Sequence, residues 1–147
     1  MLKFLSIPAV LAALSGAAMA FQGTVNSQLA QKTSLLSSTL TVHIIGTLAA
    51  AFTIIIWKTP IFAHKWMQIP WYLYIGGLLS VAIVALVALS ISKIGVCNAT
   101  TAIIVGQVGI AVLIDHFGLL GVQRIAWNPW QILGLALFAV GAKLLFR

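Results

Sequence analysis

The sequence predicts an all-α membrane protein with five transmembrane helices, and its composition is the first evidence for this. Of its 147 residues, 62% are hydrophobic and only 6% are charged, whereas a soluble domain carries about 25% charged residues. In lipid every backbone amide must be paired inside the protein, which leaves helices or a closed barrel. The long apolar runs of this chain favour helices, because barrel strands alternate apolar and polar residues over short segments.

Charged residues divide the chain into five apolar windows. Most windows reach or approach the roughly 20 residues that a helix needs to cross about 30 Å of hydrocarbon. We therefore expect helices at approximately 4–22, 34–57, 71–92, 99–114 and 130–146, in a single transmembrane domain over residues 1–147. The tryptophans fall near the expected helix ends, where an amphipathic ring is stable at the membrane interface: Trp57, Trp66, Trp71, Trp127 and Trp130.

The first apolar window has a second interpretation. Lys3, an apolar stretch and the sequence Ala18-Met19-Ala20 also fit a cleavable signal peptide. Four more apolar windows follow it in place of a soluble domain. We therefore prefer a membrane span for this window.

The positive charges point to a membrane and leave the orientation open. The net charge is +7, but the basic residues are spread singly, whereas nucleic-acid binding requires a cluster. With five spans, four basic residues fall on each side: Lys3, Lys58, Lys65 and Arg124 against Lys32, Lys93, Lys143 and Arg147. The positive-inside rule then gives no orientation. This tie predicts dual topology, and the alternative is a weak bias settled by the first helix.

Four polar residues lie within the expected spans or, in the case of Asn26, just beyond one. They are Gln22, Asn26, His43 and Gln107. Polar groups in a span cost free energy and usually face partners, water or substrate, so we expect these four to line a substrate path. The alternative is interhelical hydrogen bonding, which contributes only about 0.6 kcal/mol per bond on average. A titrating His43 would also suit proton coupling.

Asp115 is the only acidic residue in the chain, and His116 follows it. One interpretation is structural, with the carboxylate holding the turn through His116, Arg124 or backbone amides. The other is a gate or a proton site formed by Asp115 and His116. The chain has no second carboxylate, no metal-ligand spacing and no phosphate-binding loop. We therefore expect no catalytic residue, no metal, no cofactor and no enzymatic activity.

Four stretches of sequence carry a resemblance to a known family. They are Gln22-Gly23-x-x-Asn26-x-x-Leu29, Pro70-Trp71-Tyr72 with Gly76-Gly77, Gly106-Gln107, and Asp115-His116-Phe117-Gly118 with Gly121. Together they resemble the five-helix branch of the drug/metabolite transporter superfamily, a small bacterial inner-membrane family similar to a half-unit of EamA-type transporters. The resemblance extends over nearly the whole chain.

The resemblance implies half of an inverted-repeat transporter. Larger members of the superfamily resemble two five-helix units in inverted orientation with the substrate between them, which is a general transporter plan. A lone unit is then expected to dimerise, as an antiparallel homodimer or with a paralogous partner subunit. We expect a multi-pass protein of the bacterial inner membrane, a secondary transporter subunit for a small polar or amphipathic solute. The alternative is a non-transporting assembly or regulatory subunit.

Overall fold

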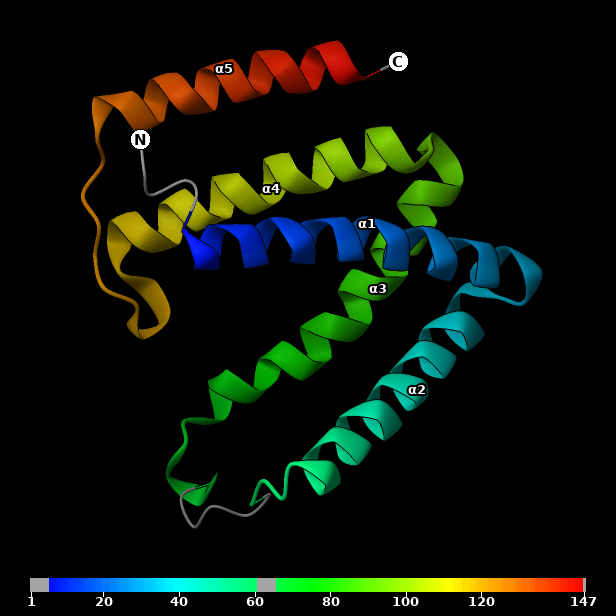
Figure 1. Ribbon diagram of the computed structural model, residues 1–147. Helices are drawn as coiled ribbons and strands as arrows, with labels where there is room; N and C mark the ends of the chain where they lie inside the picture. The colour runs from blue at the N-terminus through cyan, green and yellow to red at the C-terminus, as the bar shows by residue number, and fades with distance from the viewer. Residues whose placement is uncertain (1–5, 61–65, 147) are drawn as a thin grey trace. The chain divides into compact units, whose positions relative to one another are not determined.

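The computed structural model describes residues 6–60 and 66–146, and all regular secondary structure in them is helical (Figure 1). The elements are α1 Ile7–Lys32, α2 Leu35–Ile56, η2 Trp66–Gln68, η3 Trp71–Tyr74, α3 Ile75–Ile94, α4 Val96–Phe117, η4 Leu119–Gly121 and α5 Pro129–Leu145. The predicted all-α class with five long helices is confirmed for these residues. The expected helix start at residue 4 lies outside the described residues, as do Lys3, Lys65 and Arg147 of the charge count.

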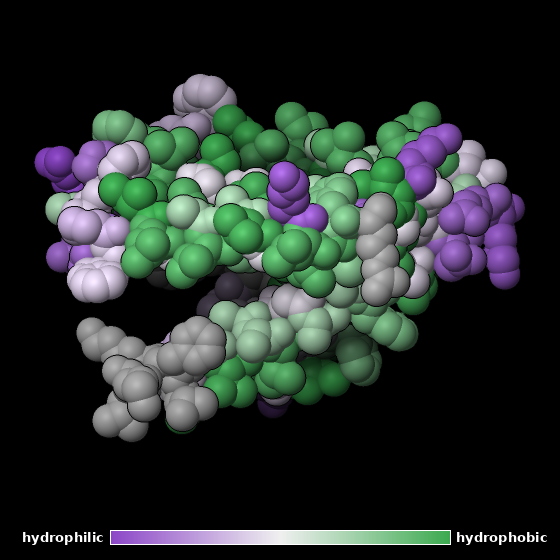
Figure 2. Space-filling model, turned by 90° about the horizontal axis from the view of Figure 1, so that it is seen from above, coloured by the Kyte–Doolittle hydropathy of each residue, from purple (hydrophilic) through white to green (hydrophobic). Residues whose placement is uncertain are grey.

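Four of the described helical segments are long and apolar enough to cross a membrane. They are α1, α2, α4, and η3 with α3 as Trp71–Ile94. The apolar helix α5 has 17 residues and is about 25 Å long at 1.5 Å per residue, slightly short of the roughly 30 Å hydrocarbon layer. Hydrophobic side chains dominate the surface seen in Figure 2. Many large hydrophobic side chains are exposed along all the long helices. Lipid solvates such a surface, so the chain is a membrane protein.

The helix ends differ most from the predicted ones in α1 and α4. The first helix does not end near Gln22 but runs without a break to Lys32, because polar residues interrupt the apolar run and not the backbone hydrogen bonding. The fourth helix is longer at both ends than 99–114 and lies between Gly95 and Gly118. Both glycines have positive φ, +82° and +63°, a conformation that ends a helix at little steric cost.

The chain divides into two compact units, and the boundary between them along the sequence lies between Ser92 and Lys93. The first unit contains α1, α2 and α3, and the second contains α4, η4 and α5. Each unit is described by itself below.

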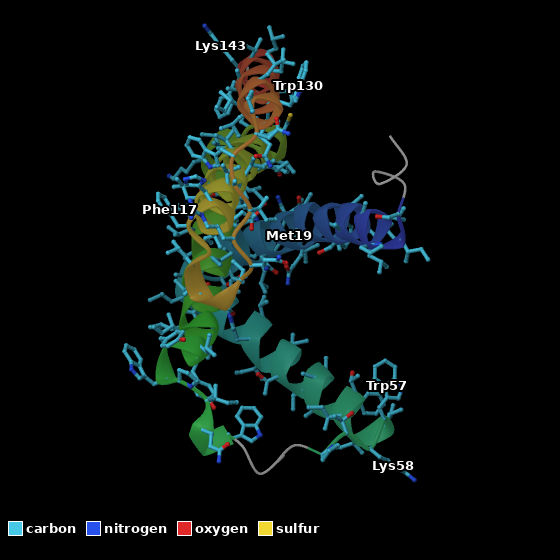
Figure 3. All side chains as sticks on the ribbon, turned by 90° about the vertical axis from the view of Figure 1, so that its left-hand side faces the viewer. Met19, Trp57, Lys58, Phe117, Trp130 and Lys143 are labelled. Atoms are coloured by element: carbon cyan, nitrogen blue, oxygen red, sulfur yellow. The ribbon has the colours of Figure 1, made fainter. Side chains whose placement is uncertain are left out.

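In the first unit, α1 packs against both other helices. The chain reverses at Thr33 and Ser34, and the buried hydroxyl of Ser38 on α2 donates to the carbonyl of Asn26 on α1 at 3.2 Å. On another side of α1, Gly23 is buried against α3. These contacts hold the middle of α1 close to α2 and α3, whereas the far end of α2, with Trp57 and Lys58, lies away from α1 (Figure 3).

Candidate functional site

A polar pocket lies among α1, α2 and α3, inside the first unit. Its volume is about 350 Å³, and we call it the polar pocket; its lining residues are Gln22, Val42, His43, Gly46, Thr47, Ala50, Ser80 and Val84. A smaller pocket of about 40 Å³ shares Gln22 and Val84 with it and is also lined by Asn26. Three of the four predicted path residues, Gln22, Asn26 and His43, therefore lie around two adjoining pockets.

His43 connects α2 to α3 across the polar pocket. Its Nδ1 atom lies 2.8 Å from the carbonyl oxygen of Thr39, one turn earlier on the same helix. Its Nε2 atom lies 2.8 Å from the hydroxyl of Ser80 on α3. A carbonyl oxygen can only accept a hydrogen bond, so Nδ1 carries a hydrogen. In the neutral ring Nε2 is then the acceptor, and the Ser80 hydroxyl donates to it.

Two other polar side chains of the pocket have no hydrogen-bond partner within the described part of the chain. On α2, the hydroxyls of Thr39, Thr41 and Thr53 donate to the carbonyl four residues earlier, at 2.8 to 2.9 Å. Thr47 on the same helix makes no such bond, and the amide of Gln22 makes none either. A threonine in a helix ordinarily bonds back to its own backbone. The pocket therefore contains a hydroxyl and an amide that are free to bind a ligand.

Asn26 takes part in helix packing and also lines the smaller pocket. It is only 6% exposed, and its backbone carbonyl is the acceptor for Ser38. Next to it, the Ser27 hydroxyl is buried and has no partner among residues 6–60 and 66–146. This part of α1 therefore carries buried polar residues, and the backbone of Asn26 takes part in packing against α2.

Gln107 lies on α4, in the other compact unit, and is exposed. It is not among the residues that line the polar pocket. The glycines beside it, Gly106 and Gly109, have open space where a side chain would begin. Its expected role in the substrate path stays a prediction.

Asp115 and His116 lie at the end of α4, where the chain turns back. The amide of Ile125 donates to the carbonyl of Asp115 at 2.8 Å. The Nε atom of Arg124 donates to the carbonyl of His116 at 3.0 Å. The Asp115 carboxylate itself is exposed and forms no ion pair within the described residues. The backbone carbonyls of Asp115 and His116 therefore hold this turn, and the expected structural role of the carboxylate stays a prediction.

The imidazole of His116 is part of a small aromatic cluster. Its ring centroid lies 4.9 Å from that of Phe117 and 4.8 Å from that of Trp127. Its Nδ1 atom is buried without a partner in the described part of the chain. The cluster packs the loop before α5 against the end of α4. A gating or proton-carrying role for Asp115 and His116 stays a prediction.

No group of three or more metal-ligating side chains occurs among the residues that the structure describes. The polar pocket accordingly offers hydrogen-bonding groups and one imidazole as its chemistry. Ser80 is the member that the sequence did not single out, since it is one hydroxyl within an apolar helix.

Comparison with known proteins gives a family. No match was found among curated proteins or among solved structures. One family model, designated DMT_YdcZ, matches residues 7–144, which is almost the whole chain. This match confirms the resemblance to a small bacterial inner-membrane family and is consistent with the drug/metabolite transporter type. The protein therefore belongs to the family described as "Putative inner membrane exporter, YdcZ".

Proposed function

We propose that the protein is a subunit of a secondary transporter that moves a small polar or amphipathic solute across the bacterial inner membrane. The observation that carries this proposal is the polar pocket. Its polar residues lie in the interior of apolar helices, with Gln22 fifteen residues after the start of α1 and His43 eight residues after the start of α2. Polar groups at such depth in a membrane are costly and generally serve a transported solute or a partner.

The size of the polar pocket limits the solute. Its volume of about 350 Å³ is at the lower end of the roughly 300–1,000 Å³ typical of small-molecule sites. Valine, glycine and alanine line part of it beside the polar groups. A solute with one polar end and a small apolar body would satisfy both kinds of lining.

A second subunit would complete the pocket. Gln22, Gly46, Thr47 and Ala50 are exposed, so the pocket opens at the surface of the chain. In a lone chain the polar side chains of Gln22 and Thr47 would face lipid, which cannot hydrogen-bond to them. We propose an antiparallel homodimer, or a pair with a paralogous subunit of opposite orientation, in which α5 also crosses the membrane. The tie in basic residues supports the homodimer.

Flux through reconstituted protein tests this function. Proteoliposomes are loaded with mandelate, mandelamide and 2-amino-1-phenylethanol, which share an aryl group and a hydroxyl and differ in charge. At least one should leave faster than from protein-free liposomes. Thr47→Val should reduce that flux at least fivefold, because Thr47 lines the pocket with a free hydroxyl.

Thr53→Val is the matched control, since Thr53 lies on the same helix and its hydroxyl is bonded to its own backbone. It should leave the flux unchanged. No flux above that of protein-free liposomes would favour the assembly or regulatory subunit. Equal flux in both variants would place the solute path away from Thr47.

A further inference from the structure

The charges around the polar pocket restrict the solute that it can hold. The only acidic residue of the chain is Asp115, so the helices that form the pocket contribute no carboxylate. The lining residues of α1 and α3 are uncharged, and His43 on α2 is the only titratable side chain among all the lining residues. A cationic solute would meet no counter-charge from this chain, and an unpaired charge away from water is costly.

The hydrogen bonds of His43 determine what the pocket presents in each protonation state. In the neutral ring, Nε2 accepts from Ser80, which engages both groups. A proton on Nε2 makes that atom a donor, because Nδ1 already donates to Thr39. The Ser80 oxygen can then accept from Nε2, and its hydrogen is free to donate into the pocket. Together with the free Thr47 hydroxyl and the Gln22 amide, the protonated state offers a cluster of donors and one positive charge.

A carboxylate is the group that matches this cluster. An ionised carboxylate is an acceptor only, with two oxygens that take several hydrogen bonds. Hydrogen bonds between an imidazolium and a carboxylate are charge-assisted and stronger than neutral ones. Each ion also favours the charged form of the other when they are close together.

We propose that the polar pocket binds the carboxylate of a small organic acid together with one proton on the Nε2 atom of His43. The proposal deepens the transport function and rests on the polar pocket as the solute path. One proton from solvent accompanies one anion, so binding adds no net charge to the protein. Binding must therefore weaken as the pH rises, since the protonated ring is the binding form.

Calorimetric titration of the purified protein in nanodiscs tests this, with the same three probes. Mandelate should bind more tightly than mandelamide, and 2-amino-1-phenylethanol should bind most weakly. Titrations in two buffers of different ionisation enthalpy should give about one proton taken up per mandelate where the free ring is neutral. The mandelate affinity should fall as the pH rises, by at most the tenfold per pH unit that one linked proton gives.

Variants identify the group that takes the proton. His43→Gln keeps a donor but cannot titrate, so it should abolish proton uptake and flatten the pH dependence. Thr53→Val, on the same helix but outside the polar pocket, should keep both. Mandelate binding that is absent, weaker than that of the amine, or without proton uptake in the unaltered protein overturns the proposal, whether or not the variants fold.

Failure of this proposal is distinct from failure of transport. Proton-linked mandelate binding without flux would leave the carboxylate site in place and overturn the transport function. Flux of the amine or the amide without proton-linked mandelate binding would leave transport in place and overturn the carboxylate site.

Discussion

A Cβ atom on Gly23 would lie 2.8 Å from the Cγ1 atom of Val87, closer than such atoms approach in proteins. The backbone of α1 and a branched side chain of α3 are therefore in direct contact at this point. Gly23 follows Gln22 and lines the smaller pocket with Asn26. The absence of a side chain at Gly23 thus sets the distance between α1 and α3 at the smaller pocket.

Gly23→Leu should separate α1 from α3 and destabilise the protein. Overpacking of this kind costs about 1–3 kcal/mol, which should lower the thermal unfolding midpoint measured in detergent. Gly16→Leu on the same helix is the control, because nothing lies within 4 Å of a Cβ atom there. An equal loss of stability in both variants would mean that helix propensity, and not the contact with Val87, sets the cost.

The hydrogen bond between His43 and Ser80 should be measurable as a coupling energy. A double-mutant cycle with His43→Ala and Ser80→Ala should give about 0.6 kcal/mol, with an upper limit near 1.7 kcal/mol for interhelical bonds in membranes. Unfolding in mixed micelles provides the free energies. Ser80→Ala with Thr53→Ala, which share no bond, should be additive. Additivity of the first pair as well would show that the bond is not formed in the membrane.

The turn after α4 should depend on Gly118 and not on the Asp115 carboxylate. Gly118 has φ +63°, and a Cβ atom there would lie 3.2 Å from the Cβ atom of Arg124. Gly118→Ala should therefore lower stability by about 1–2 kcal/mol, the cost of left-handed backbone for a residue with a side chain. Asp115→Asn should be nearly neutral in the same thermal assay, because only its backbone carbonyl is engaged. A large loss for Asp115→Asn would assign the carboxylate a partner.

The proposed antiparallel homodimer requires chains of both orientations in one membrane. Reporters fused to the carboxyl terminus, one active only in the cytoplasm and one only outside, should give comparable signals. Two lysines inserted after Thr59 should shift the population toward an amino terminus in the cytoplasm, since short-loop charges orient the chain. A strong preference for one side in the unaltered protein would leave the paralogous partner as the remaining form of the dimer.

The helices were predictable from the sequence because lipid imposes a strong pattern on it. Their ends were less so, and the first helix is the clearest case. Hydropathy falls after Phe21, where Gln22, Gly23 and Asn26 follow, and this fall predicts the end of the helix near Gln22. Hydropathy indicates which residues lie in lipid and not where a helix ends. The backbone hydrogen bonds of α1 continue to Lys32, beyond the apolar residues. The fourth helix also continues beyond its expected end at residue 114, to Phe117, and a glycine such as Gly118 after the last apolar turn is a typical stop.

The site was predictable only in part. Gln22, Asn26 and His43 stand out because each is a polar residue in an apolar run. Ser80 does not, because one hydroxyl in a long apolar helix is common and its partner His43 lies 37 residues earlier. The free hydroxyl of Thr47 could not be inferred either, since nothing in the sequence distinguishes it from Thr41 or Thr53. Such differences arise from how the helices pack.

The lengths of the helices have a consequence for the lipid around the protein. α1 has 26 residues and α5 has 17, which correspond to about 39 Å and 25 Å, so both cannot stand upright in one bilayer. A span as long as α1 can relieve this hydrophobic mismatch by tilting or by extending its polar end into the headgroups. In the proposed dimer, where α5 also crosses the membrane, α5 would relieve it by thinning the bilayer beside it, at a fraction of a kcal/mol for each ångström. Longer acyl chains would therefore act on this protein mainly through α5, at the opposite end of the chain from the polar pocket.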